Sequence, residues 1–308
     1  AIHCRKRGSQ EAREEVLLDV NQAAKGYSYY AASSPKPSPD NRWQVFAEDT
    51  VGRYQYALRF QELSTGKDLD ERIENTTGEA IWAEDSKTVF YVEKDPKTLL
   101  GTKVRKHVLG TDPAGDPVVY EEKDCSFYLG IGKTSDERYI GIHSSSTVSD
   151  ELRFIPADQP NSPFQIFAAR EDNIEYSADH VKDHWVIRTN LDAENFRIME
   201  VKDNKIGDRK GWSEVIPHDQ GVYIAKMGLF DDHLVIAERR KGLKKLRIHR
   251  WSDGKEHFIA IDDPASVTDI DFNAEPNTPW LRFNYNSLKT PLSIYEEHME
   301  TGERRLLK

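Results

Sequence analysis

A hairpin unit recurs six times along this chain, and its regular spacing constrains the fold more than any other feature. Each copy consists of an apolar strand, a polar turn centred on Asp or Asn, and a second apolar strand. The central turn residues are separated by 45, 51, 47, 49 and 45 residues; they are Asp40, Asp85, Asp136, Asp183, Asp232 and Asn277. Asp and Asn suit these positions because their side chains can hydrogen-bond to backbone amides just ahead in a tight turn. Repetition at such a period indicates an array of similar structural units.

Two further strands follow the hairpins, which gives each unit four strands within about 45 residues. Third strands are expected at residues 54–60, 103–109, 151–155, 195–201, 244–250 and 293–297. Shorter fourth strands are expected at residues 117–120, 164–167, 213–216, 257–261 and 304–307. A four-stranded antiparallel sheet repeated around an axis is the architecture of a β-propeller. A β-sandwich, the main alternative, does not repeat one four-stranded unit six times.

The sequence therefore predicts an all-β fold, a seven-bladed β-propeller that occupies residues 1–308 as a single domain. Six complete blades of four antiparallel strands are expected at about residues 27–74, 78–121, 126–168, 174–216, 222–261 and 268–308. Residues 1–20 contain two more strands, at 2–6 and 15–19, which we expect to be the outer strands of an incomplete first blade. The chain lacks an initiator Met, which favours a start within a longer protein.

Composition narrows the classes of partner. The net charge of -10 and the mean hydropathy of -0.72 predict an acidic surface in contact with water. No apolar run approaches the ~18 residues that span a membrane, and no signal peptide is recognisable. An acidic surface disfavours nucleic acid as a partner and attracts cationic ligands. Cys4 and Cys125 lie far apart without metal-ligand spacing, so we expect free thiols and a cytoplasmic location.

Short motifs spread along the whole chain carry a family signature in their order and spacing. They are EVLLDVN (15–21) followed by SPD (38–40), AEDTVGR (47–53), YEEKD (120–124), RTN (188–190) with NF (195–196), ERRKGL (238–243), YNSLKTP (285–291) and METGERRLLK (299–308). Together they resemble the N-terminal propeller of the prolyl oligopeptidase family of serine peptidases, and its oligopeptidase B (protease II) branch in particular. The last motif is similar to the junction between that family's propeller and its catalytic domain.

The resemblance implies a cytosolic serine peptidase that cleaves short peptides after Lys or Arg. In that family, the catalytic Ser, Asp and His belong to a C-terminal α/β-hydrolase domain, and the propeller covers the active site as a size filter. The present sequence contains neither that domain nor the Gly-x-Ser-x-Gly motif of a nucleophile elbow. We therefore expect no catalytic residue and no cofactor in this chain. The expected partners are the α/β-hydrolase domain and short basic peptides.

Two patterns are typical of metal or acid–base sites but have a simpler interpretation here. His180 and His184 are four residues apart, a spacing that aligns two metal ligands on a helix. The surrounding pattern is strand–turn–strand, so we expect a turn-exposed pair and no metal site. Acidic doublets such as Glu121-Glu122 and Asp231-Asp232 are expected in solvated turns, because neighbouring residues of a strand face opposite ways.

Eight charged residues near the ends of inner strands are the candidates for the channel wall or for contacts with the catalytic domain. They are Glu48, Asp49, Arg53, Glu79, Glu84, Glu238, Arg239 and Arg240. The alternative is that these charges are solvated or form ion pairs between neighbouring blades. Exposed ion pairs contribute only ~0–1 kcal/mol each, so we expect them to tune domain opening. The six tryptophans are expected to pack between blades.

Two other functions remain open on the sequence alone. The first is a stand-alone scaffold for protein interactions, which is disfavoured because Trp-Asp dipeptides and the Gly-Gly doublets of kelch repeats are missing. The second is a propeller glycosidase or lyase, which would need two channel carboxylates about 5–9 Å apart in a closed pocket.

Overall fold

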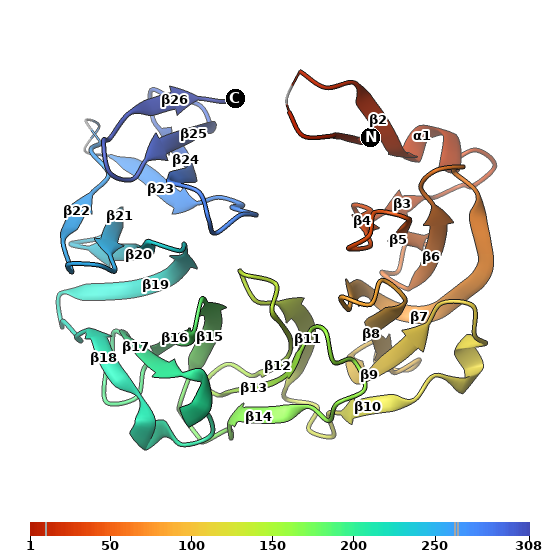
Figure 1. Ribbon diagram of the computed structural model, residues 1–308, viewed down its shortest axis with the longest axis horizontal. Coiled ribbons are helices and arrows are strands. Elements are labelled where there is room, and N and C mark those ends of the chain that lie inside the picture. The colour runs from red at the N-terminus through yellow and green to blue at the C-terminus, as the bar shows by residue number, and fades with distance from the viewer. Residues whose placement is uncertain (10, 262, 264) are drawn as a thin grey trace. The chain divides into compact units, whose positions relative to one another are not determined.

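The computed structural model describes residues 1–308 apart from residues 10, 262 and 264. The chain is built almost entirely of antiparallel β strands joined by short turns (Figure 1). Its internal contacts divide it into two compact units. Unit 1 contains Ala1–Lys133, Ile140–Ser146 and Arg153–Gln165, and unit 2 contains Thr134–Tyr139, Thr147–Leu152 and Ile166–Lys308. Among the described residues, no helix has the length and apolar character that crossing a membrane requires.

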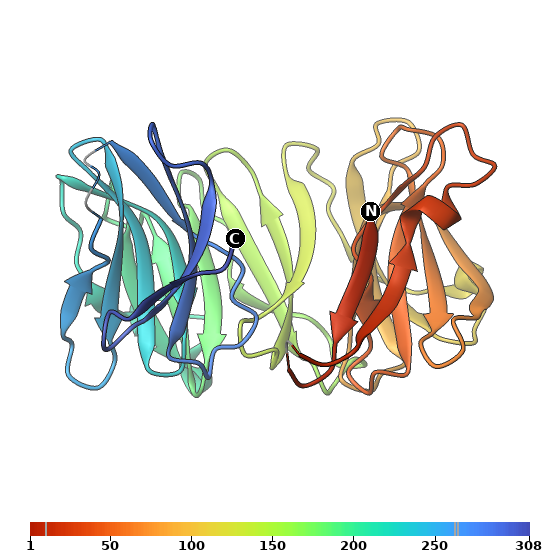
Figure 2. The same ribbon diagram turned by 90° about the horizontal axis from the view of Figure 1, so that it is seen from above.

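The N-terminal segment forms a two-stranded antiparallel sheet, visible beside the N label in Figure 2. β1 (Ile2–Lys6) pairs with β2 (Glu14–Asp19). A short helix, α1 (Val20–Ala23), follows directly, and the Asp19 carboxylate caps it by accepting from the Asn21 amide at 2.9 Å. Both strands predicted within residues 1–20 are therefore present.

The next sheet contains eight strands in the order β10-β9-β8-β7-β6-β5-β3, with β4 also paired to β5. Its members are β3 (Ala31–Ala32), β4 (Lys36–Pro37), β5 (Trp43–Asp49), β6 (Tyr56–Glu62), β7 (Asp68–Trp82), β8 (Thr88–Lys94), β9 (Gly101–Val108) and β10 (Val118–Glu121). The long strand β7 crosses residues 75–77, where the sequence placed a boundary between two blades. The single strand β7 therefore includes both the last strand of one predicted blade and the first strand of the next.

A bulge interrupts β7 at this crossing. The register between β7 and β8 shifts between Thr76 and Ala80, and Asn75 and Gly78 have positive φ angles of 59° and 91°. A side chain at Gly78 would place its Cβ 2.9 Å from Cδ2 of Tyr56, so the close approach requires glycine. Because a bulge bends a strand, the two halves of β7 can belong to separate four-stranded arrangements.

Four separate four-stranded antiparallel sheets follow in chain order. The first contains β11 (Tyr128–Lys133), β12 (Tyr139–Ser145), β13 (Asp150–Pro156) and β14 (Gln165–Ala168), and the second contains β15 (Tyr176–Val181), β16 (His184–Thr189), β17 (Arg197–Lys202) and β18 (Ser213–Ile216). The third contains β19 (Val222–Leu229), β20 (His233–Arg240), β21 (Leu243–Arg250) and β22 (Glu256–Phe258). The fourth contains β23 (Ser266–Ile270), β24 (Trp280–Ser287), β25 (Ser293–His298) and β26 (Arg304–Leu306). Single-turn helices occur at η1 (Pro113–Gly115), η2 (Asp203–Lys205) and η3 (Arg209–Gly211). The predicted third and fourth strands are confirmed within a few residues. The largest difference is at β22, which ends at Phe258, whereas the sequence predicted a strand up to residue 261.

The first three hairpin turns, at Asp40, Asp85 and Asp136, make the hydrogen bonds that the sequence predicted; Asp136 Oδ1 accepts from the Arg138 amide at 3.2 Å. Asp85 Oδ1 accepts from the Lys87 amide at 3.0 Å and the Thr88 amide at 2.8 Å. Asp40 Oδ1 likewise accepts from the amide of Arg42 at 3.0 Å. Partial burial acts to raise the pKa of Asp85, but the hydrogen bonds from Lys87 and Thr88 outweigh it and hold that pKa below its ordinary value.

In the part of the chain that the structure describes, buried apolar side chains form clusters in both units. In unit 1, one cluster is centred on Phe60 and Trp82 and the other on Phe90 and Ile142. In unit 2, the two clusters include Val186 with Ile236, and Phe230 with Phe283. Three tryptophans are buried, namely Trp82, Trp185 and Trp212. The other three, Trp43, Trp251 and Trp280, are partly buried. Cys4 and Cys125 are exposed free thiols, as predicted.

Candidate functional site

Glu48, near the end of β5, is a buried carboxylate at the centre of a charged cluster in unit 1. Its side chain is 5% exposed. It accepts hydrogen bonds from Tyr30 Oη at 2.9 Å, from Arg59 Nη1 at 3.0 Å and from Arg72 Nη1 at 2.5 Å. Arg59 and Arg72 lie opposite each other on β6 and β7, so Glu48 neutralises two adjacent like charges. Burial and the hydrogen bond to Glu48 raise the pKa of Tyr30, which keeps its hydroxyl protonated as a donor.

Asp49, the next residue, organises the loop between β5 and β6. It is 1% exposed. Its Oδ1 accepts from the amides of Val51 and Gly52, both at 2.9 Å, and its Oδ2 accepts from the amide of Tyr54 at 2.8 Å. Burial opposes ionisation of Asp49, but these amides outweigh that effect and lower its pKa. The folded loop leaves Arg53 exposed, together with Val51 at 64% and Tyr54 at 73%.

Replacing Asp49 with Ala is expected to lower the free energy of unfolding by about 1–3 kcal/mol, because three backbone amides of the loop lose the charged acceptor that they share. Limited proteolysis should then cut the loop at residues 50–55 faster than in the wild type. Arg53→Ala, in the same loop, is the matched control and should change stability by less than about 0.5 kcal/mol. Equal effects of the two substitutions would show that Asp49 does not order the loop.

Glu79 and Glu84, on either side of Trp82, connect β7 with strand β11 in unit 1. Glu79 Oε2 accepts from the amide of Ile131 at 3.3 Å. Glu84 Oε1 pairs with Lys133 Nζ at 2.5 Å. Both contacts join consecutive sheets, and the Glu84–Lys133 pair fits the interpretation of ion pairs between neighbouring blades, whereas Glu79 bonds a backbone amide.

Glu238 repeats the arrangement of Glu48 in unit 2. It lies near the end of β20 and is 1% exposed. Its carboxylate pairs with Arg240 Nε and, at 2.8 Å, with Arg247 Nη2. Arg247 also pairs with Glu256 on β22 at 3.1 Å. Arg239, between the two paired residues, is exposed, so it is available to a partner in the way that Arg53 is in unit 1.

The sequence-predicted residues therefore fall into three structural groups. Glu48, Asp49 and Glu238 are buried and organise their own strand ends. Glu79 and Glu84 link consecutive sheets. The exposed cations of the set are Arg53 and Arg239, and Arg240 is partly exposed beside Phe258, with its guanidinium carbon 5.5 Å from the ring centroid.

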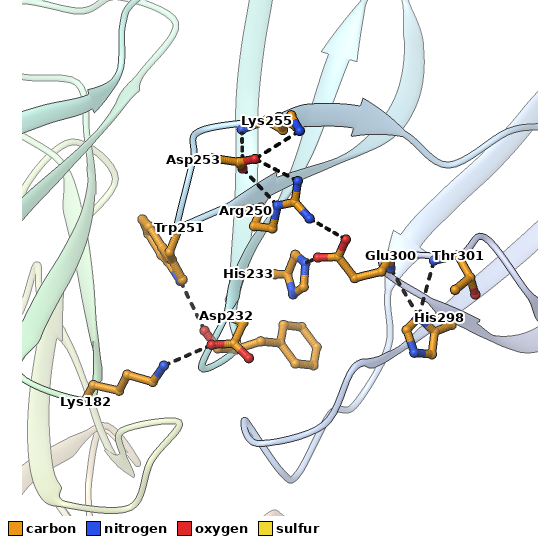
Figure 3. Close-up of polar contacts among 11 residues, drawn as sticks. Lys182, Asp232, His233, Arg250, Trp251, Asp253, Lys255, His298, Glu300 and Thr301 are labelled. Carbon is orange, nitrogen blue, oxygen red and sulfur yellow. Dashed lines mark hydrogen bonds and ion pairs between the residues drawn. The ribbon is translucent and has the colours of Figure 1, made fainter.

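A second set of contacts joins consecutive sheets of unit 2 and was missed by the sequence analysis (Figure 3). It lies at the start of β20, the opposite end of that strand from Glu238. Glu300, in the turn between β25 and β26, accepts from Arg250 Nη1 at 2.6 Å and bonds His233 Nε2 at 2.7 Å. Lys182 Nζ bonds Asp232 at 3.1 Å across the preceding pair of sheets. The signal was present in the repeat, since Asp232 is a turn centre and His233 and Lys182 lie next to turn centres.

Two fully buried histidines each bridge a pair of carboxylates: His107 lies between Glu71 and Asp116, and His180 between Asp136 and Asp203. His180 Nδ1 lies 2.6 Å from Asp136 Oδ2, and its Nε2 lies 2.9 Å from Asp203 Oδ1. The expected turn-exposed pair is therefore wrong for His180, which has no exposed side-chain area, while His184 keeps 17%. The strand β15 turns His180 inward, and the neighbouring turn centre Asp136 supplies its partner. In the part of the chain that the structure describes, no group of three His, Cys, Asp or Glu side chains could hold a metal ion.

A hollow of about 680 Å³ lies in unit 1 among the start of β5, the start of β7 and the loop after β9. Arg42 lies over the Trp43 ring at 4.9 Å on one wall. The acidic side chains of Glu71 and Asp112 and the cation Lys87 line the same space. Side chains of both charge signs therefore line the hollow.

Comparisons with known proteins agree with this architecture. The family profile described as "Prolyl oligopeptidase, N-terminal beta-propeller domain" matches residues 1–308. The chain is 44% identical to dipeptidyl aminopeptidase BI of Pseudoxanthomonas mexicana, over 96% of this chain and 41% of that protein. It is 29% identical to Protease 2 of Moraxella lacunata, over 100% of this chain and 45% of that protein.

Among solved structures, oligopeptidase B from Leishmania major superimposes with a TM-score of 0.91 at 26% identity, covering all of this chain and 45% of that one. The chain thus spans less than half the length of these relatives. The predicted β-propeller fold and the family resemblance are confirmed, whereas the count of seven blades stays a prediction.

Proposed function

Because the chain belongs to the prolyl oligopeptidase family, as its N-terminal β-propeller domain, we propose that it gates access to a peptidase active site located elsewhere in the full-length protein. The observation that carries the proposal is the match of the whole chain to this one domain, in relatives more than twice as long. The catalytic Ser, Asp and His then belong to a C-terminal α/β-hydrolase domain. The propeller acts on substrates by excluding large proteins.

Specificity for Lys or Arg at the cleavage site is the finer part of the proposal. Its support is the likeness to Protease 2 and to oligopeptidase B structures, together with the net charge of -10. A negatively charged domain raises the local concentration of cationic peptides through a long-range field that salt weakens. The full-length protein is therefore expected to bind basic peptides less well as ionic strength rises.

A second activity is favoured by the relative at 44% identity, which is named a dipeptidyl aminopeptidase. Such an enzyme removes dipeptides and needs a free substrate N-terminus, whereas an endopeptidase accepts a blocked one. The two activities differ in how substrate is positioned in the active site, and both are compatible with a gating propeller.

The test compares the full-length protein with the present chain on two fluorogenic substrates, an N-terminally blocked arginyl reporter and an unblocked dipeptidyl reporter. We expect hydrolysis only by the full-length protein, and abolition by a serine-directed covalent inhibitor. Turnover of the blocked arginyl reporter supports the oligopeptidase B specificity, and turnover of the unblocked reporter alone supports the dipeptidyl alternative. Hydrolysis by the present chain would refute the non-catalytic role.

A further inference from the structure

The loop between β24 and β25 exposes two leucines at one end of the last sheet of unit 2. Leu288 is 96% exposed and Leu292 is 69% exposed. Val267, at the start of β23, is 47% exposed and lies opposite Asn286 near the end of β24. We call residues 288–292 the leucine loop. Exposed apolar side chains grouped in this way are typical of an interaction surface.

The leucine loop is ordered by its own hydrogen bonds. The Ser287 hydroxyl accepts from the amides of Lys289 and Thr290, both at 3.1 Å. The Ser287 amide donates to the Thr290 carbonyl at 3.0 Å, and the Ser293 hydroxyl donates to the Pro291 carbonyl at 2.9 Å. A backbone held at both ends presents its leucines in a defined position, which reduces the ordering cost of binding.

The end of the chain indicates what covers this loop. The Ile294 amide donates to the Lys308 carbonyl at 2.8 Å, and the Leu307 amide donates to the Ile294 carbonyl at 2.8 Å. Lys308 therefore lies beside the start of β25, directly after the leucine loop (the C label in Figure 2). In the relatives this domain is N-terminal and makes up 41–45% of the protein, so the polypeptide that follows it starts next to Leu292.

We propose that the leucine loop, with Val267, is a docking surface for an apolar patch on the domain that follows Lys308. This inference rests on the proposed function, because that domain is the catalytic partner named there. Contact at this point would keep the following domain against the end of the last sheet and would limit how far the two can separate. A second copy of the chain is the competing occupant.

The first test measures access to the loop in the full-length protein. Leu288→Cys and Phe272→Cys are made separately in a background where Cys4 and Cys125 are replaced by Ser. Phe272 is the matched control because it is 74% exposed and follows β23 at the opposite end of the same sheet. We expect thiol labelling at position 288 to be at least about tenfold slower than at position 272 in the native protein, and equal in denaturant.

Equal native rates at the two positions would overturn the proposal. Protection of position 288 that disappears on dilution would also overturn it, since the occupant would then be a second copy. Neither readout requires catalytic activity. A full-length protein without peptidase activity but with a protected position 288 would therefore contradict the proposed function and leave the docking surface standing.

The second test weakens the contact. In the full-length protein, Leu288→Ser combined with Leu292→Ser is expected to speed proteolytic cleavage just after Lys308 by about fivefold or more, because the cleaved segment opens more often. Phe272→Ser should leave the cleavage rate unchanged. Both sites are exposed, so folding is expected to be retained, and an unchanged unfolding midpoint verifies this. Cleavage of the double variant at the wild-type rate would contradict the proposal.

Discussion

Replacing Glu48 with Ala is expected to lower the free energy of unfolding by about 2–4 kcal/mol. The substitution leaves Arg59 and Arg72 opposite each other on β6 and β7 without the carboxylate that both contact. It also removes the acceptor of the Tyr30 hydroxyl. Because Glu48 is 5% exposed, water cannot fully replace it. Chemical denaturation of the present chain measures the loss.

Two variants make this result specific to the buried charge. Glu48→Gln retains shape and one acceptor oxygen, so its loss should lie between those of wild type and Glu48→Ala. Glu62→Ala, on the adjacent strand β6, removes a carboxylate that lies 3.9 Å from Arg42 and is 26% exposed, and it should cost less than about 1 kcal/mol. If Glu48→Ala is no more harmful than Glu62→Ala, the Glu48 cluster does not stabilise this strand end.

The strand arrangement was predictable because it depends on local chemistry. Asp40 and Asp85 form turns with amides two or three residues ahead, and alternation of apolar residues fixes which face of each strand is buried. These interactions lie within one hairpin, so periodicity along the chain suffices to locate them. The same reasoning could not anticipate β7, where a bulge lets one strand continue across a predicted blade boundary.

Burial of the charged candidates was not predictable, because it depends on partners from distant parts of the sequence. The sequence suggested Glu48 for the channel wall or a contact with the catalytic domain, and its burial became evident only with Arg72, 24 residues away, placed beside it. His180 looked like a turn residue until Asp136, 44 residues away, was placed beside it. Sequence spacing identified the correct strand ends. The structure then distinguished the buried carboxylates that order these strand ends from exposed residues such as Arg53 and Arg239.

The same distinction changes where partner contacts are expected. Buried carboxylates that are already paired with arginines or backbone amides have little to offer a peptide or a second domain. The exposed parts of the loops that they organise remain available, which are Arg53 and Tyr54 in one unit and Arg239 in the other. A partner would therefore recognise the loop surface, while Glu48, Asp49 and Glu238 determine its shape.

Replacing His180 with Ala is expected to lower the free energy of unfolding by about 3 kcal/mol, through a cavity and two lost hydrogen bonds. The imidazole packs against the rings of Tyr139 and Trp185, with centroids 4.8 and 5.2 Å away. It also bonds Asp136 and Asp203, and each carboxylate would lose this hydrogen bond. Denaturant unfolding at about pH 7 measures the difference.

The pH dependence of this variant identifies the carboxylate involved. Burial acts to raise the pKa of Asp136, but the hydrogen bond and charge of His180 outweigh it, so the folded pKa lies below the ordinary 3.8. A lowered folded pKa contributes stability that is complete above the ordinary pKa and is lost as pH falls through the folded value. The deficit of His180→Ala relative to wild type should therefore shrink below about pH 4.

His184→Ala is the matched control, four residues away on the other strand of the same hairpin. His184 is 17% exposed and lies 3.3 Å from Asp183, which is itself 74% exposed, so its removal should cost less than about 1.5 kcal/mol. His184 also lowers the pKa of Asp183, but Asp183 is largely exposed, so below about pH 4 the deficit of His184→Ala should shrink by less than that of His180→Ala. Similar losses and similar pH profiles for the two variants would mean that the buried bridge from Asp136 through His180 to Asp203 does not stabilise the sheet, since only His180 makes that bridge.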